Sequence, residues 1–189
     1  MPLARRAAAG GYPVDRGARN GSALVRRGGA GKSSAISDAI SELPDFSLVA
    51  DDGREVTAAD LRGGRVVLWF YPRADTPGCT TEAEDFTRLA ADFEALGVAL
   101  HGASPDTPAK VARFKERRDI APTLLADEDA ALAKAMGVWV EKRMYGRTGM
   151  GVERSTFLLE GGRIVERWRK VRVRGHAETV LEAARDAFG

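Results

Sequence analysis

The single cysteine of the chain, Cys79, is the side chain best suited to chemistry. It follows a loop rich in proline and glycine and precedes apolar residues at helical spacing, so we expect it at the N-terminal end of a helix. Unpaired backbone N–H groups and the helix macrodipole favour the thiolate there, which is the nucleophilic form. The hydroxyl of Thr76 can reach the same space. The competing interpretation is a small, buried, apolar cysteine.

The segments around Cys79 predict a site at the edge of a sheet. Residues 66–71 form the longest apolar run and indicate a buried central strand. After the loop, Phe86, Leu89, Ala90, Phe93 and Leu96 recur at helical spacing, and Gly97 ends the helix. Ligands of open α/β sheets bind outside the carboxyl ends of the strands, which is where this strand leads into the cysteine loop.

The remaining chain alternates apolar strands with amphipathic helices, which predicts an α/β fold class. We expect a first hairpin around Asp51-Asp52-Gly53 and a second, of residues 155–159 and 163–168, around Gly161-Gly162. Between and after them we expect strands at 98–103 and 123–125 and helices from Thr107, at 130–136 and at 177–188.

Composition and charge divide the chain into a tail at residues 1–37 and one domain at residues 38–189. The chain has 189 residues, 44% hydrophobic and 30% charged, as is typical of a globular domain. The six-residue apolar run is far shorter than the roughly 18 residues of a membrane span. The tail holds seven basic residues and one acidic residue, a charge of +6, so the rest carries −4 of the net +2. We expect this Gly-, Ala- and Arg-rich tail to be disordered.

The role of the tail stays open between a targeting peptide, a functional arm and an incidental extension. Gly31-Lys32-Ser33 lacks the glycine and the preceding strand of a phosphate-binding loop. Nucleic acid binding is not favoured, because Tyr12 is the tail's one aromatic stacking partner.

The cysteine loop resembles the active site of the peroxiredoxins, also called the AhpC/TSA family. The family pattern P-x-x-x-T-x-x-C matches Pro72, Thr76 and Cys79, and its distant arginine matches Arg154. The similarity covers about residues 43–188 and is closest to the peroxiredoxin Q, or bacterioferritin comigratory protein, subgroup. The subgroup motifs are Phe70-Tyr71-Pro72, Thr76-Pro77-Gly78-Cys79-Thr80, Ser104-Pro105-Asp106 and Gly175-His176-Ala177.

This resemblance implies a thioredoxin-like fold, with a central mixed sheet between helices, and a cofactor-free thiol peroxidase. Cys79 would attack hydrogen peroxide or an organic hydroperoxide, Thr76 would hydrogen-bond the peroxide, and Arg154 would hold the thiolate and polarise the peroxide. Pro72 would shield the sulfur from water. Two further residues would support the site, Gly78 and Glu82. Glu82 is interpreted either as orienting a guanidinium such as that of Arg154 or as a solvated acid in the first helical turn.

The chain departs from many members of this subgroup in lacking a second, resolving cysteine. The position five residues after Cys79 is Glu84. A sulfenic acid on Cys79 must therefore be resolved by an external thiol, such as a thioredoxin- or glutaredoxin-type protein or a small thiol. The alternative function is a stoichiometric redox sensor or adaptor that passes oxidation to a client protein. A third is a binding module without redox activity.

Other residue patterns support no further site. His101 and His176 have no cluster of ligands around them, and Asp127-Glu128-Asp129 lacks the pattern of a calcium loop, so we expect no metal. Trp139 is interpreted as a packing residue or as part of a dimer surface. We expect a monomer or homodimer in the cytoplasm, with no membrane partner.

Overall fold

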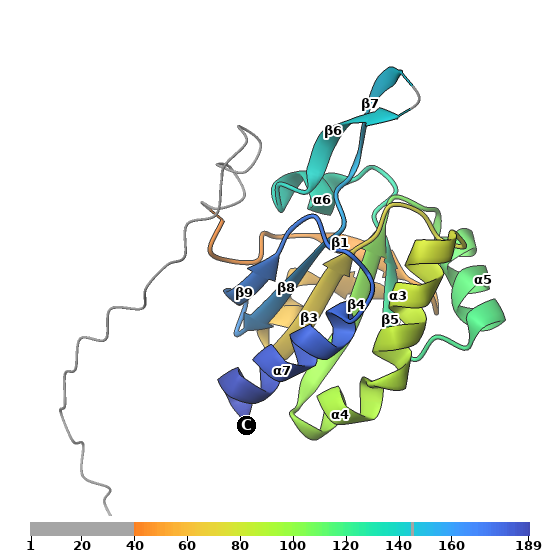
Figure 1. Cartoon of the computed structure of the whole chain (residues 1–189). Coiled ribbons are helices and arrows are strands. Elements are labelled where there is room, and N and C mark those ends of the chain that lie inside the picture. The colour runs from red at the N-terminus through yellow and green to blue at the C-terminus, as the bar shows by residue number, and fades with distance from the viewer. Residues whose placement is uncertain (1–39, 145) are drawn as a thin grey trace, which may run out of the picture.

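The computed structural model describes residues 40–144 and 146–189, so the prediction for the tail at residues 1–37 lies outside the described residues. The domain is built on a seven-stranded mixed sheet with strand order β2-β1-β5-β4-β3-β8-β9 (Figure 1). The central strands β3, β4 and β5 are parallel, and antiparallel strands flank them. The strands are β1 (Ser47–Ala50), β2 (Glu55–Thr57), β3 (Arg65–Phe70), β4 (Val98–Ser104), β5 (Thr123–Ala126), β8 (Ser155–Glu160) and β9 (Arg163–Trp168). The predicted α/β class and both predicted hairpins are confirmed.

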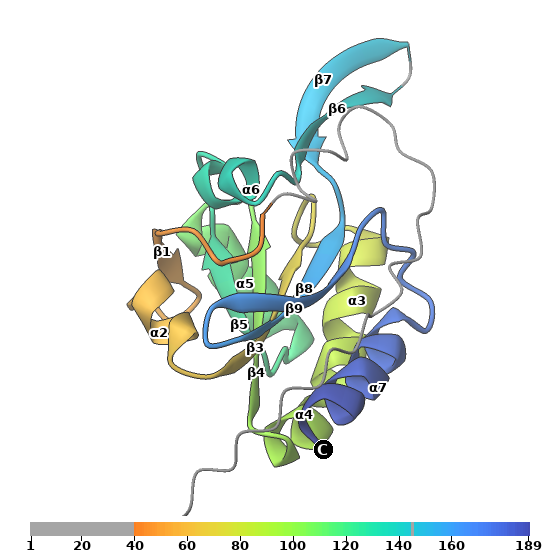
Figure 2. The ribbon, with the colours of Figure 1, turned by 90° about the vertical axis from the view of Figure 1, so that its left-hand side faces the viewer.

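Helices cover both faces of the sheet (Figures 1 and 2). The face that includes Val67 and Trp69 packs against α3 (Pro77–Arg88), which contains Cys79, and against α4 (Ala90–Ala95), α5 (Pro108–Arg118) and α7 (His176–Phe188). The opposite face packs against α2 (Ala58–Arg62) and α6 (Ala131–Ala135). None of the described helices is long and apolar enough to cross a membrane.

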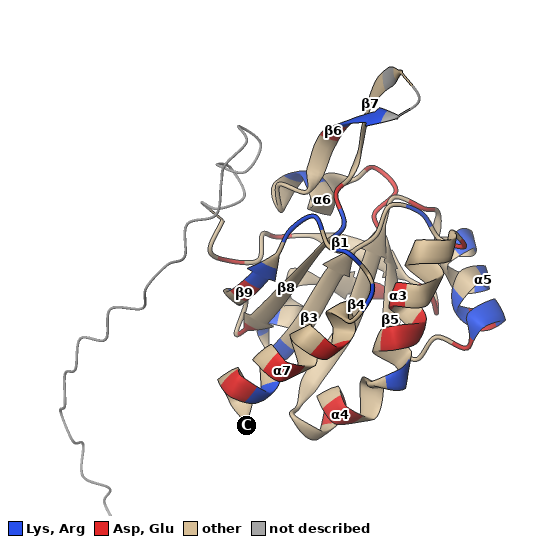
Figure 3. Ribbon diagram, viewed as in Figure 1, with Lys and Arg blue, Asp and Glu red and all other residues tan. Residues whose placement is uncertain are grey.

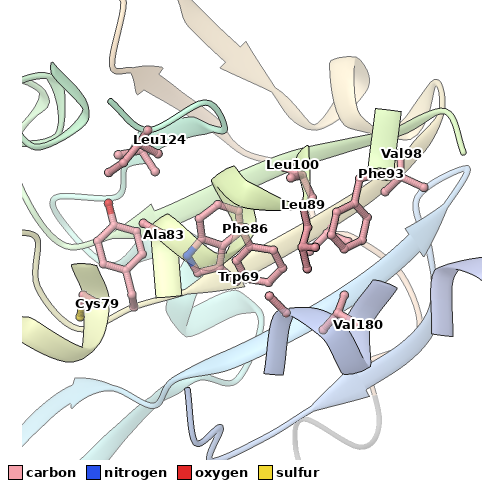
Figure 4. Close-up of a cluster of buried hydrophobic side chains, with 14 of the residues drawn as sticks. Trp69, Cys79, Ala83, Phe86, Leu89, Phe93, Val98, Leu100, Leu124 and Val180 are labelled. Atoms are coloured by element: carbon pink, nitrogen blue, oxygen red, sulfur yellow. The ribbon is translucent and has the colours of Figure 1, made fainter. Parts of the chain in front are cut away.

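The two faces of β3 explain why this strand lies in the middle of the domain. Val67 and Trp69 point to one apolar core, whereas Val66, Leu68 and Phe70 point to the other. Trp69 stacks on Phe86 of α3 with ring centroids 4.5 Å apart (Figure 4). A strand buried on both faces has a continuous apolar sequence, which is the pattern that predicted it.

Gly102 of β4 makes room for this tryptophan. A Cβ atom at Gly102 would lie 2.5 Å from Cζ2 of Trp69. The glycine therefore lets the indole ring lie directly against the neighbouring strand.

Two elements differ from the expectations. The helix expected to run to Gly97 is two helices, because the backbone leaves helical geometry at Leu89 between α3 and α4. The hairpin of β6 (Trp139–Met144) and β7 (Arg147–Val152), which projects from the domain, was not predicted (Figure 2). β6 does not alternate apolar and polar residues, and β7 contains two glycines, so the usual strand pattern is weak.

Candidate active site

Cys79 lies at the third position of α3, at the carboxyl end of the central strand. β3 ends at Phe70, and the chain turns before entering α3, where Thr76 is the N-cap and Pro77 the first helical residue. Proline suits that position because its missing N–H would have no partner there. Cys79 is 1% exposed and contacts the core, as Figure 4 shows at one end of the cluster. The interpretation as a buried cysteine is thus right about burial, and the sulfur also has a charged neighbour, Arg154.

Arg154 is the cation next to the sulfur. Its Nη2 donates to Sγ of Cys79 at 3.2 Å, and its Nη1 donates to Oε2 of Glu82. The antiparallel register that pairs Phe70 with Ser155 brings Arg154 beside the cysteine loop, although 75 residues separate it from Cys79 in sequence. Gly78 lies against the same guanidinium, because a Cβ atom there would be 3.5 Å from Nη2.

Glu82 is buried beside Arg154 and is not solvated. It is 1% exposed, and its Oε1 has no hydrogen-bond partner among the described residues. Burial raises the pKa of Glu82 to about 7, against the opposing effect of Arg154. Burial lowers the pKa of Arg154, but the charges of Glu82 and Cys79 outweigh it and raise that pKa overall. A sulfur, a guanidinium and a carboxyl group thus form a row, in which the guanidinium contacts both of its neighbours.

The loop before Cys79 is held by a buried aspartate, Asp106, which the sequence analysis named in a subgroup motif but gave no role. The backbone N–H of Ala74 donates to Asp106 at 2.6 Å, and the hydroxyl of Ser104 donates to the same carboxylate at 3.0 Å. Lys110 of α5 pairs with the other oxygen of Asp106. The sequence contained a sign of this contact. Ser104-Pro105-Asp106 lies at the carboxyl end of β4, the parallel neighbour of β3, and therefore at the same edge of the sheet as the cysteine loop.

A second contact fixes the loop from α5, on which many Lys and Arg residues lie (Figure 3). Asp75 has a backbone φ of 63°, an uncommon conformation for a residue other than glycine. Its carboxylate accepts a hydrogen bond from Arg117 at 2.8 Å. The loop therefore has a defined shape before any ligand binds.

The other predicted site residues, Thr76 and Pro72, lie in the loop before Cys79 and have other contacts. The hydroxyl of Thr76 donates to the carbonyl of Arg73 at 3.0 Å. Pro72 lines a cavity of about 380 Å³ between the loops and the β6–β7 hairpin. The structure thus brings Arg154 into contact with both Cys79 and Glu82, with Thr76 and Pro72 in the loop before Cys79.

The two histidines differ in their distance from this row, and the charge of Arg154 acts on His176. Nε2 of His176 lies 2.8 Å from the Thr156 hydroxyl, and burial lowers the pKa of His176 to about 4. His101 lines a different cavity, and burial also lowers its pKa to about 4. No group of three metal-ligating side chains occurs within residues 40–144 and 146–189.

A family model now identifies the chain, because the AhpC/TSA family model matches residues 40–167. The chain belongs to the AhpC/TSA family. It is 42% identical over 144 residues to "Peroxiredoxin Bcp" of Bacillus subtilis, an alignment that covers 76% of this chain and 92% of that relative. It is also 42% identical over 153 residues to "Peroxiredoxin Bcp" of Xanthomonas campestris, which covers 78% of this chain and 96% of that one.

Solved structures agree with this assignment. A structure of Xanthomonas campestris peroxiredoxin Q has 41% sequence identity and a TM-score of 0.75 and covers 80% of this chain and 99% of that one. A crystal structure of peroxidoxin BcpB from Mycobacterium tuberculosis has 32% identity and a TM-score of 0.68, covering 77% and 94%. This AhpC/TSA chain is therefore a peroxiredoxin and a thiol peroxidase, with the expected thioredoxin-like fold.

Proposed function

We propose that this peroxiredoxin reduces hydrogen peroxide and organic hydroperoxides through Cys79 alone and is restored by an external thiol. The observation that carries the proposal is the 3.2 Å contact between Arg154 Nη2 and Cys79 Sγ in a chain with one cysteine. The contact supports a thiolate held beside a fixed cation. The cysteine count supports a cycle that another molecule completes.

In the oxidative step the thiolate of Cys79 attacks the terminal oxygen of the hydroperoxide. An S–O bond forms, the O–O bond breaks, and the sulfur is oxidised to the sulfenic acid. The leaving alkoxide, or hydroxide from hydrogen peroxide, takes up a proton from the medium. We assign Arg154 to stabilise the charge that develops on the breaking bond, and Thr76 to hydrogen-bond the peroxide after turning from the Arg73 carbonyl. Pro72 covers the reacting sulfur.

Charge stabilisation must supply more of the acceleration than thiolate formation does. An ordinary thiol of pKa about 8.5 is roughly 3% ionised at pH 7, so full ionisation increases the thiolate only about thirtyfold. That gain is about 2 kcal/mol, whereas enzymatic accelerations usually need about 8 kcal/mol or more. We therefore assign the larger share to Arg154, which Glu82 holds in place, and to the N–H groups at the start of α3.

In the reductive step an external thiol attacks the sulfenic sulfur. A mixed disulfide between Cys79 and the external thiol forms, and water leaves. A second external thiol then attacks the external sulfur of this disulfide. Cys79 is released as the thiol, and the two external thiols leave joined as a disulfide. No cysteine of this chain can replace the external thiol.

The experiment that tests this function is rapid mixing of reduced protein with a slight excess of hydrogen peroxide, followed by tryptophan fluorescence. Cys79→Ser is the matched variant. We expect a fast fluorescence change that the serine variant lacks, and then repeated turnover when a thiol and more peroxide are supplied. A rate no faster than that of free cysteine would overturn the peroxidase. One fast turnover without thiol-driven recycling would overturn the catalytic cycle and favour a stoichiometric sensor.

A further inference from the structure

The cavity beside Pro72 is larger than hydrogen peroxide requires. Its volume of about 380 Å³ is in the range of sites for small organic molecules. Its walls come from the loops after β3 and β4 and from the β6–β7 hairpin. The lining residues include Pro72, Pro105, Trp139, Met150 and Val152, and Lys142 is the one charged residue among them.

The hairpin directs Lys142 toward the catalytic end of the domain. Lys142 pairs with Gly149 in the register of β6 and β7, and it lies on the same face of the hairpin as Gly151. A Cβ atom at Gly151 would lie 3.4 Å from Cδ of Lys142, so the lysine stem passes close over a strand position without a side chain. The ammonium then reaches and donates to the carbonyl of Val152, two residues before Arg154.

The charge of Lys142 interacts with the active site. Burial and the charge of Arg154 lower the pKa of Lys142, while Glu153 and Cys79 act in the opposite direction. An ammonium has three N–H donors, and the Val152 carbonyl takes one of them. Lys142 is thus a partly buried cation that lines the mostly apolar cavity beside Pro72, and its charge interacts with Arg154 and Cys79.

We propose that Lys142 determines specificity by pairing with a carboxylate on the organic molecule that reacts at Cys79, whose apolar part lies in this cavity. The inference rests on the proposed function, because it requires Cys79 to react. Two reactants share this chemistry. One is a hydroperoxide that carries a carboxylate and oxidises Cys79, and the other is a thiol that carries a carboxylate and reduces the sulfenic acid.

The experiment compares matched reactants that differ only in charge. In the thiol arm, 3-mercaptopropionate and 3-mercaptopropionamide reduce the sulfenic acid in single turnovers. In the peroxide arm, an alkyl hydroperoxide with a terminal carboxylate and its terminal amide oxidise the thiol. The readout in each arm is the rate with the carboxylate divided by the rate with the amide. A general loss of activity in a variant cancels in this ratio.

We expect Lys142→Gln to lower this ratio about tenfold in at least one arm, as for loss of a charge-assisted hydrogen bond. Lys142→Arg should keep the ratio within a few fold. The matched control is Arg143→Gln, which removes a positive charge from the next residue of β6, exposed and on the opposite face of the hairpin. It should leave the ratio unchanged.

The arm that responds identifies the reactant as the hydroperoxide, the thiol or both. Equal ratios for wild type and Lys142→Gln in both arms would overturn the proposal. A salt series on the wild type gives a test that does not depend on the variant folding. The responding ratio should fall as salt screens the ion pair, and a ratio that salt leaves unchanged contradicts the proposal.

Failure of this inference is distinct from failure of the proposed function. If wild-type protein does not react rapidly with hydrogen peroxide, the peroxidase is wrong and the inference falls with it. If it reacts rapidly but the ratios do not depend on Lys142, only the inference is wrong.

Discussion

The two ends of the seven-stranded sheet each have a cavity, and the end without the cysteine has the larger one. At the amino ends of β3, β4 and β5, a cavity of about 800 Å³ is lined by apolar residues and glycines, by charged residues and by His101. At the carboxyl ends, the cavity beside Pro72 has about 380 Å³. Cys79, Arg154 and Glu82 belong to the carboxyl end, where a loop leads into the start of α3. The volume of a cavity therefore does not locate the chemistry of this fold. The chemistry is located by a nucleophile, a cation and a helix N-terminus that lie together.

The buried titratable groups of the two ends also differ in their partners. Glu82 is paired with Arg154, whereas Nδ1 of His101 has no hydrogen-bond partner among the described residues. Burial acts on both pKa values and disfavours the charged form in both cases, so it raises one and lowers the other. At the catalytic end the buried acid is thus paired with a cation, whereas at the opposite end burial favours the neutral form of His101.

The largest expected effect comes from removing the cation of the catalytic end. Arg154→Ala should slow the reaction of Cys79 with hydrogen peroxide about 10²- to 10³-fold, as for loss of a donor to a developing negative charge. Arg54→Ala, which removes an exposed guanidinium from the other end, is the control and should change the rate less than about twofold. Stopped-flow rates, corrected for the ionised fraction of the thiol, check this. Equal rates for Arg154→Ala and wild type would refute the role.

The next effect concerns stability and pH at Glu82. Its pKa is raised from an ordinary 4.5 to about 7 in the folded protein, so the folded state binds more protons between these values. This extra proton binding stabilises the folded state, and its contribution is fully present below pH 4.5. About 3 kcal/mol of the free energy of unfolding is lost as pH rises through 7. Glu82→Gln should remove this loss. Urea unfolding from pH 4.5 to 8 measures it, and identical pH slopes in both proteins would contradict the account.

His101 should show the opposite pH dependence. Its folded pKa of about 4 lies below the ordinary 6.5, so the unfolded state binds more protons between these values. Its stabilising contribution is present above pH 6.5 and is lost as pH falls through 4, by about 2 kcal/mol after allowance for partial exposure. The same unfolding series on His101→Gln tests this, and the variant should lack that loss. A shift in the direction seen for Glu82 would show that the two ends do not differ as argued.

A smaller effect is expected from the loop anchor. Asp106→Asn keeps the size of the side chain but removes the charge that pairs with Lys110 and weakens the bond from Ala74 N–H. The rate with peroxide should fall about tenfold through misplacement of the loop. The control is Asp52→Asn, an exposed aspartate that pairs with Arg54 near the other end of the sheet. A rate in Asp106→Asn as high as in the control would mean that the loop keeps its shape without this anchor.

The sequence was sufficient for the parts of the fold that follow local patterns. The continuous apolar run predicted β3, and the glycine-centred turns predicted the flanking hairpins. The β6–β7 hairpin was missed because it is largely exposed and because β7 has glycines where a strand usually has side chains to bury. The break at Leu89 was missed because the apolar spacing continues across it.

The sequence also predicted the identity of the main site residues but not their contacts. The position of Cys79 before a helix followed from the loop residues, and the family resemblance named Arg154. Arg154 reaches the sulfur through the pairing of β3 with β8, and Asp106 reaches Ala74 from the end of β4. These contacts join distant segments, so local spacing could not show them. Lys142 was missed because its direction depends on the register of the missed hairpin.

The most direct test of the central claim is the intact mass of the protein after one equivalent of hydrogen peroxide, and again after a small thiol is added. The account predicts that wild-type protein gains one oxygen atom, then forms a mixed disulfide, and returns to its original mass with excess thiol. Cys79→Ser should show none of these changes. An oxygen that also appears on Cys79→Ser, or a sulfenic acid that thiols do not convert to a mixed disulfide, would contradict a one-cysteine peroxidase centred on Cys79.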